Sequence, residues 1–297
     1  MEQANKQDFR PKDWSAKKTF SGLGLRLLVA VLGIPALLAA VWIGGYWLLA
    51  LVAILSLLGM KEFYHLAQVK GYAPLSWWGY AIGLSVILAV FFGHHYLWGL
   101  SVILLLLMFF SIVIRAKVDT AIMSLSSTVF GLIYVSLLLS HMILLRYISD
   151  PVMLFDEVYD PVGSKLIVLT FALIWIGDTG AYFTGMAFGK KPLAPKISPK
   201  KSMEGLAGGA LFTLAAAFLI ARYWIWELSL WQTLVLGLGV VIFGTLGDLF
   251  ESLLKRDAGV KDSGSLLPGH GGVLDRFDSM MFALPFVYWF CRIFVLG

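Results

Sequence analysis

Charged residues are scarce in this sequence of 297 residues: 14% are Asp, Glu, Lys or Arg, whereas 59% are hydrophobic. A soluble globular domain carries about 25% charged residues. The composition therefore excludes an ordinary soluble protein and indicates one that is embedded in a bilayer. At about 20 residues per span, the chain has room for about nine or ten membrane-spanning helices.

Other absences narrow the class further. Cysteine occurs once, as Cys291, which excludes an intramolecular disulfide. The sequence has no glycine-rich Walker loop, so a P-loop nucleotide site is excluded. It also has no basic run interleaved with aromatic residues, and we expect no nucleic acid partner. Residues 1–23 lack the apolar core of a cleavable signal and are expected to form a cytoplasmic tail.

Long apolar segments are what the sequence has in abundance. They predict an all-α polytopic membrane protein with about nine transmembrane helices. We expect an N-terminal scaffold at 24–147 with about five helices. A C-terminal region at 164–297, with about four helices, holds the intramembrane carboxylates. The nine segments cover residues 24–43, 45–66, 76–93, 96–115, 125–146, 165–188, 205–223, 228–254 and 277–296.

Positive charge is segregated along these segments. If the N-terminus is cytoplasmic and the segments alternate in direction, every Lys and Arg is cytoplasmic except Arg146, Lys165, Arg222 and Arg292. The acidic loop at 148–163 then lies on the opposite side. Because cytoplasmic loops carry an excess of Lys and Arg, the pattern predicts a cytoplasmic N-terminus and an external C-terminus.

An aspartate lies deep within the segment at 165–188. Asp178 is about ten residues, or ~15 Å, from the cytoplasmic end, and it shares a helical face with Tyr182 and Gly185. An ionisable group at this depth is costly unless it meets a partner or a wet cavity. We expect this face to line a polar cavity. The alternative is a buried aspartate paired with another helix, the glycines serving only close packing.

The loop after this segment is strongly basic. GKKPLAPKISPKKSMEG, residues 189–205, has five lysines before its one acid, Glu204. Attraction to anionic headgroups at the inner leaflet is a sufficient explanation. The alternative is a lid over a polyanionic substrate, with donors from Ser198, Lys200, Lys201 and Ser202.

A polar stripe follows in the segment at 228–254. Asp248, Glu251, Ser252 and Lys255 have the spacing of one helical face. A solvated helix end would carry charges on several faces, so the stripe predicts side chains that point inward. An Asp–Lys pair that only packs helices is the alternative.

The stretch GHGGVLDRFDS, residues 269–279, places charge at the start of the last segment. Gly271 and Gly272 let backbone N–H groups approach an anion closely. Asp275 and Asp278 lie on one face, and such carboxylates suit Mg²⁺, which shares its oxygen ligands with substrate phosphates. His270 has no second His or Cys nearby, so zinc is not expected. As an alternative, Asp275 is simply an acid at a helix N-terminus.

Acids for a metal, bases for phosphate and a cavity between helices together predict phosphoryl or nucleotidyl transfer at a lipid headgroup. The run from Ser252 to Asp278 resembles the signature of the phosphatidate cytidylyltransferase (CDP-diacylglycerol synthase) family. It reads SLLKR, DAGV, KD, SGSLLPG and HGGVLDRFD, with no departure from that pattern. DTGAYFTGMAFGK and SPKKSMEG are also similar to that family, so the resemblance covers roughly residues 165–280.

The resemblance implies that CTP and phosphatidic acid are the substrates, and CDP-diacylglycerol and pyrophosphate the products. It implies Mg²⁺ in a paired-metal centre whose second ion is unknown. By position, Asp248 and Asp275 would hold metal with support from Asp278, and Asp178 and Tyr182 would line a cavity open to the cytoplasm. It further implies a homodimer among membrane lipids, in the inner (plasma) membrane. The other implied contacts with substrate are Ser198, Lys200, Lys201, Ser202, Ser252, Lys255, Arg256, Lys261, His270, Gly271, Gly272 and Arg276.

Two other functions fit part of the pattern. A CTP-dependent polyprenol or phytol kinase is a related lipid phosphotransferase, and the complete run from Ser252 to Asp278 argues against it. An ion-coupled transporter would use Asp178 and Asp248 as coupling sites. Such a transporter usually has an internal repeat and acids near the midplane. Here we find no repeat, and the acids lie toward one side.

Overall fold

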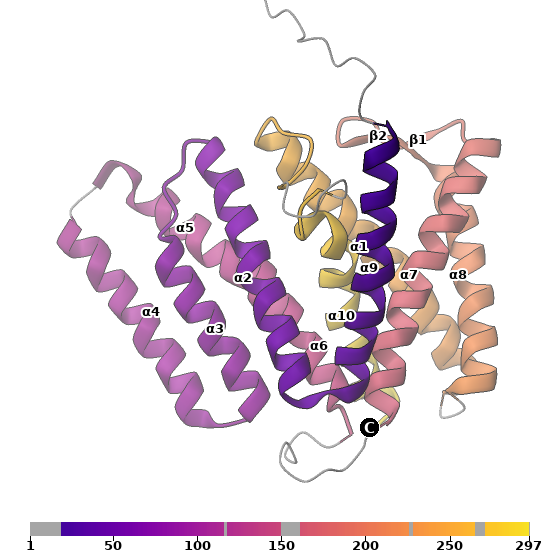
Figure 1. Cartoon of the computed structure of the whole chain (residues 1–297), viewed down its shortest axis with the longest axis horizontal. Helices are drawn as coiled ribbons and strands as arrows, with labels where there is room; N and C mark the ends of the chain where they lie inside the picture. The colour runs from indigo at the N-terminus through magenta and orange to yellow at the C-terminus, as the bar shows by residue number, and fades with distance from the viewer. Residues whose placement is uncertain (1–18, 116–117, 150–160, 226–227, 265–270, 297) are drawn as a thin grey trace, which may run out of the picture.

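The computed structural model describes residues 19–115, 118–149, 161–225, 228–264 and 271–296. Within these residues the chain is almost entirely helical, which confirms the all-α class (Figure 1). The helices are α1 (Thr19–Ile43), α2 (Gly45–Val69), α3 (Ser76–Phe92), α4 (His95–Arg115), α5 (Ala121–Gly131), α6 (Leu138–Arg146), α7 (Pro161–Phe188), α8 (Met203–Trp224), α9 (Leu230–Asp257) and α10 (Leu274–Phe294). A 3₁₀ turn, η1 (Val118–Thr120), precedes α5, and a π-helical segment, η2 (Leu132–Leu137), joins α5 to α6.

Helix length and apolar composition support a polytopic membrane protein. In the part of the chain that the structure describes, seven helical stretches are long and apolar enough to cross a membrane. Two apolar stretches, Val29–Ile43 and Ser76–Phe92, are shorter. The count of nine spans, the placement of the termini and the division at 147–164 stay predictions.

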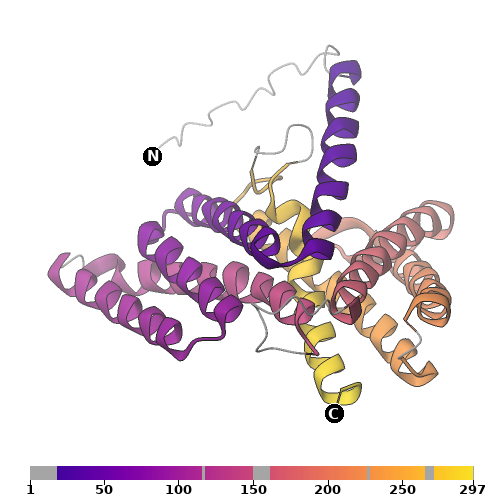
Figure 2. The same ribbon diagram turned by 60° about the horizontal axis from the view of Figure 1, so that its bottom comes forward.

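The helices run side by side, and α10 lies at the centre of the bundle (Figures 1 and 2). It packs against α9, α6, α7 and α2, so both halves of the chain contact it. Met281, Leu284 and Val287 of α10 are fully buried in the main core, together with Leu139 and Met142. Because α10 begins beside the end of α9, this packing determines where its first carboxylates lie.

The α1–α2 connection is a tight hairpin. Gly44 and Gly45 both have positive φ, 71° and 54°, a conformation that other residues adopt only with strain. The buried Arg146 donates from Nε to the carbonyl oxygen of Val41 (3.0 Å), and the amide N of Gly45 donates to the Tyr147 hydroxyl (2.7 Å). The end of α6 therefore fastens this hairpin to the bundle.

A short antiparallel hairpin lies between α7 and α8, where we expected a loop. Its strands are β1 (Pro192–Ala194) and β2 (Ser198–Ser202). The carboxylate of Glu204 accepts from the amide N of Lys190 (3.0 Å) and of Lys191 (3.1 Å), which secures the base of the hairpin. The hairpin lies at the same end of the bundle as the start of α1, and the C-terminus lies at the opposite end (Figure 1).

Candidate active site

Glycines bring α7 and α8 into direct backbone contact. A Cβ added to Gly205 would lie 2.9 Å from the Ala181 carbonyl oxygen, and one added to Gly209 would lie 2.9 Å from that of Gly177. The small-residue face of α7 thus serves close helix packing, as in other membrane bundles.

The same face of α7 also borders a small cavity. A pocket of about 50 Å³ lies between α7, α8, α9 and α10, and Asp178, Thr245 and Ser279 are among its lining residues. The two interpretations of this face are therefore compatible. Tyr182 is not in the wall of this pocket, and its side chain is 65% exposed.

The hairpin places one of its lysines against α9. Lys201 forms an ion pair with Asp248. Burial lowers the pKa of Lys201, and the nearby carboxylates of Asp178 and Asp278 oppose that shift. Lys201 therefore lies within electrostatic reach of acids from three different helices.

Close packing of α9 on α10 explains why two of these acids are neighbours. A Cβ on Gly247 would lie 2.4 Å from the carbonyl oxygen of Asp278, so only glycine lets the two backbones approach this closely. Asp248 follows directly on α9. The proximity of Asp178, Asp248 and Asp278 to Lys201 thus rests on glycine packing at both the α7–α8 and the α9–α10 contacts.

Asp275 lies in a second cluster, on the first turn of α10. Its Oδ2 accepts from the Ser263 amide N (3.0 Å), the Ser263 hydroxyl (2.9 Å) and the Gly272 amide N (2.8 Å). Its Oδ1 accepts from Lys255 Nζ at 2.6 Å. Lys255 also pairs with Glu251, whose side chain is 0% exposed. The inward direction of the stripe on α9 agrees with this arrangement.

The remaining predicted residues lie around these two clusters. Ser202 caps α8, its hydroxyl accepting from the Gly205 amide N (3.0 Å). Arg256 Nε donates to the Ile197 carbonyl oxygen (3.3 Å), which ties α9 to the hairpin loop.

The other predicted residues differ in exposure. Gly271 has a positive φ of 83°, a conformation that favours glycine. Lys200, Lys261 and Arg276 are exposed, Ser198, Ser252 and Gly271 are half-buried, and Gly272 is buried. His270 lies outside the described residues.

One residue of the N-terminal half contacts this region and was not predicted from the sequence. Glu62 of α2 is 7% exposed and accepts hydrogen bonds from the amide N of Val273 (2.9 Å) and of Leu274 (2.9 Å). We expected segments one to five to serve only as scaffold. Glu62 is an acid inside an apolar segment, and this feature of the sequence could have indicated that it has a specific role.

The carboxylates have the right chemistry for a hard divalent cation, because Mg²⁺ prefers oxygen ligands. Within the described residues, however, no three acidic, histidine or cysteine side chains form a ready metal site. The ammonium groups of Lys201 and Lys255 contact Asp248 and Asp275 instead. The carboxylate oxygens are thus of a type that binds such a cation, and in this structure Asp248 and Asp275 are paired with lysine ammonium groups.

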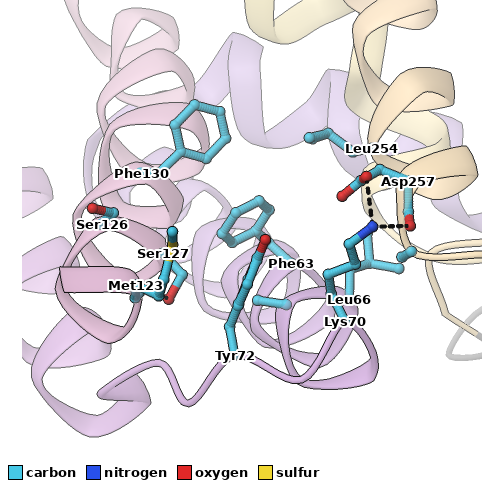
Figure 3. A pocket seen from close by; sticks show the side chains of 12 residues that line it. Phe63, Leu66, Lys70, Tyr72, Met123, Ser126, Ser127, Phe130, Leu254 and Asp257 are labelled. Atoms are coloured by element: carbon cyan, nitrogen blue, oxygen red, sulfur yellow. Dashed lines mark hydrogen bonds and ion pairs between the residues drawn. The ribbon is translucent and has the colours of Figure 1, made fainter. Parts of the chain in front are cut away.

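A larger hollow lies away from these clusters. It has a volume of about 290 Å³ and lies between α2, α5 and α9 (Figure 3). Phe63, Phe130 and Leu254 line it, and at its edge Lys70 Nζ donates to Asp257 Oδ1 (2.8 Å). None of the predicted site residues lines this hollow, so the carboxylate clusters remain the better candidate for the chemistry.

The fold and the site define a polytopic membrane protein with acids and bases gathered at one end of a helical bundle. Comparison with known proteins narrows this class. The family model described as "Cytidylyltransferase family" matches residues 24–294. A phosphatidate cytidylyltransferase from Synechocystis sp. is 35% identical over 280 residues, which are 89% of this chain and 95% of the relative.

Relatives from other bacteria agree. A phosphatidate cytidylyltransferase from Staphylococcus aureus is 33% identical over 261 residues, covering 88% of this chain and 96% of that protein. One from Haemophilus influenzae is 46% identical over 137 residues, 44% of this chain and 48% of the relative. The chain belongs to the cytidylyltransferase family, and it is a nucleotidyltransferase.

Proposed function

We propose that this enzyme transfers the cytidylyl group of CTP to phosphatidic acid, producing CDP-diacylglycerol and pyrophosphate. The observation that carries the proposal is the match to relatives named phosphatidate cytidylyltransferase over 88–89% of the chain. The two clusters of acids and lysines at one end of the bundle supply the electrostatics that such a reaction needs.

The bond changes explain the demand for positive charge. A phosphate oxygen of phosphatidic acid attacks the α-phosphorus of CTP, and the bond from that phosphorus to the bridging oxygen of the β-phosphate breaks. Pyrophosphate leaves with the electron pair. The attacking phosphate is already an oxyanion near neutral pH, so no strong general base is required. Two anions must instead approach each other, and fixed positive groups lower that barrier.

Lys201 and Lys255 are the lysines best placed for this role. Each is partly buried and held against a carboxylate, and this limits the reorganisation needed when charge develops. Lys200, Arg256, Lys261 and Arg276 are further candidates for contact with the pyrophosphate. His270 stays a candidate phosphate donor.

Mg²⁺ is part of the proposal, in a centre with a second, unidentified ion. Asp248, Asp275 and Asp278 would hold it, since their carboxylate oxygens suit this cation. When bound, it would neutralise phosphate charge and orient the triphosphate. Asp178 would line the adjoining cavity, which we propose is open to the cytoplasm.

The setting of the enzyme is also proposed. The protein has multiple membrane-spanning helices, and its named relatives are bacterial. We place it in the inner membrane with its active site on the cytoplasmic side, because the lysine-rich segments lie at the end that carries the site. We also propose a homodimer, which native mass spectrometry of the purified protein would test.

Incorporation of radiolabelled CTP into chloroform-soluble lipid tests the reaction. The assay contains purified protein, phosphatidic acid and Mg²⁺, and compares wild type with Asp248→Asn. We expect labelled lipid from wild type only when phosphatidic acid is present, and background label from the variant. Asp257→Asn is the matched control on the same helix, because Asp257 pairs with Lys70 away from both clusters.

Other outcomes identify the rival functions. If several species of phosphatidic acid yield no labelled lipid, the cytidylyltransferase proposal is wrong. Transfer of the γ-phosphate of CTP to a polyprenol would then indicate a lipid kinase. Flux of ions through the purified protein in vesicles would indicate a transporter.

A further inference from the structure

The first turn of α10 takes its cap from a distant helix. A helix N-terminus has backbone N–H groups without partners inside the helix, and a side chain usually accepts from them. The N-cap residue of α10 is Val273, whose side chain cannot accept a hydrogen bond. The carboxylate of Glu62, on α2, accepts from the amides of Val273 and Leu274 instead, both at 2.9 Å.

The segment around this carboxylate is shaped to enclose it. A Cβ added to Gly264 would lie 2.7 Å from Glu62 Oε1, and one added to Gly272 would lie 2.4 Å from Oε2. Glycine at both positions therefore lets the backbone close over the acid. The negative charge also lies where the helix dipole favours it.

A serine connects this cap to the predicted catalytic carboxylate. The hydroxyl of Ser263 lies 3.2 Å from Glu62 Oε2 and 2.9 Å from Asp275 Oδ2. On its other side, Asp275 Oδ1 lies 2.6 Å from Lys255 Nζ. Glu62, Ser263, Asp275 and Lys255 thus form one continuous polar chain from α2 to α9.

We propose that Glu62 is a positioning residue for the active site. It fixes the first turn of α10 and the Ser263 hydroxyl, so that Asp275 faces Lys255 in the geometry that catalysis uses. It acts through Asp275 and does not itself touch the reactants. The inference rests on the proposed function, because it assigns Asp275 to the reaction centre.

Glu62→Gln tests the proposal with little change in size. The amide keeps one oxygen but presents N–H groups to one of its present donors. We expect turnover per folded molecule to fall by about 10- to 100-fold, as for other partners that orient a metal-binding carboxylate, with little change in the KM for CTP. Lys61→Gln, its exposed neighbour on α2, should match wild type in turnover.

Hydrogen–deuterium exchange gives a readout that does not depend on activity. In Glu62→Gln we expect faster exchange in a peptide that covers residues 271–276, and unchanged exchange in α3 and α4. Ser263→Ala should cause a smaller loss of turnover. The double variant should lose less than the product of the two single losses, since both residues act through Asp275.

A purely structural role would give a different result. Glu62→Gln would then lower the melting temperature and the yield, while the folded fraction would turn over like wild type. That result, or unchanged exchange at 271–276, would overturn the proposal.

If Glu62→Gln does not fold, Glu62→Asp and Ser263→Ala decide the question by the same measurements. If wild type itself makes no labelled lipid, the proposed function fails, and exchange still reports whether Glu62 holds the start of α10.

Discussion

Lys201 and Lys255 show how single residues of this site depend on partners from other parts of the chain. Lys201 contacts Asp248, 47 positions away, and Lys255 contacts both Glu251 on its own helix and Asp275 on α10. Buried charges are tolerated only when they are paired, and removal of one partner leaves the other uncompensated. The acids and lysines of this site therefore form a single electrostatic unit.

Lys201→Met tests whether the enzyme needs the positive charge of this lysine among the acids of the site. The substitution keeps most of the side-chain volume but leaves Asp178, Asp248 and Asp278 without their shared ammonium group. We expect turnover to fall by about 10²- to 10³-fold, the usual loss when one group that stabilises transition-state charge is removed. The label-incorporation assay measures it, and Lys196→Met, an exposed lysine of the same hairpin, is the control. Turnover close to wild type in Lys201→Met would remove Lys201 from the mechanism.

The pair α7–α8 is the element on which the position of Asp178 depends. Gly177, Gly205 and Gly209 let the two helices touch through their backbones. Helix pairs in membranes associate mainly through such close packing, because lipid offers no hydrophobic drive between them. The hairpin that carries Lys201 connects the same two helices, so their spacing also determines where that lysine lies.

Gly209→Val therefore tests whether close packing of α7 against α8 stabilises the protein. Its Cβ would lie 2.9 Å from the Gly177 carbonyl oxygen and 3.0 Å from the Ala181 Cβ, and the backbone oxygen cannot rotate away. We expect destabilisation of about 1–3 kcal/mol, the usual cost of overpacking. Thermal unfolding in detergent would show a lower melting temperature. Gly33→Ala should not lower that temperature, since a Cβ there meets nothing within 4 Å; equal melting of all three proteins would contradict the packing argument.

At the scale of the whole molecule, the hairpin and the C-terminus lie at opposite ends of the bundle (Figure 1). The segregation of lysine and arginine predicts that the hairpin end faces the cytoplasm. Because α10 packs against helices from both halves of the chain, both halves position the site. This packing explains why Glu62 of α2 contacts a site whose other residues lie mainly in the C-terminal helices.

Cysteine labelling tests this orientation. In Lys196→Cys the new thiol lies in the hairpin loop, and in His94→Cys it lies in the α3–α4 connection at the other end; both positions are exposed. A membrane-impermeant maleimide should label Lys196→Cys only in inside-out vesicles, and His94→Cys only in right-side-out vesicles. The native Cys291 is buried and provides the unlabelled background. Labelling of both variants from one side would contradict the predicted topology.

The membrane class, the apolar segments and the motif residues could be predicted from the sequence alone. These features depend on composition, on which residues recur at helical spacing, and on the spacing of residues within a short motif. All of these are local properties of the sequence. The period along α9 correctly predicted that Asp248, Glu251 and Lys255 point inward. We also expected Tyr182 to line the cavity with Asp178, but its side chain is exposed and lies outside the wall of that pocket. Which part of a helical face meets the cavity depends on α8 and the bundle around it.

Which charges meet depends on how distant helices pack, and the sequence did not predict it. Glu62 lies 211 positions before Val273, and no periodic or local pattern indicates that contact. The pairing of Lys201 with Asp248 likewise depends on a hairpin between α7 and α8 and on glycine contacts between helices. A sequence motif indicates which side chains a reaction requires. The positions of those side chains in space follow from the packing of helices that lie far apart in the chain.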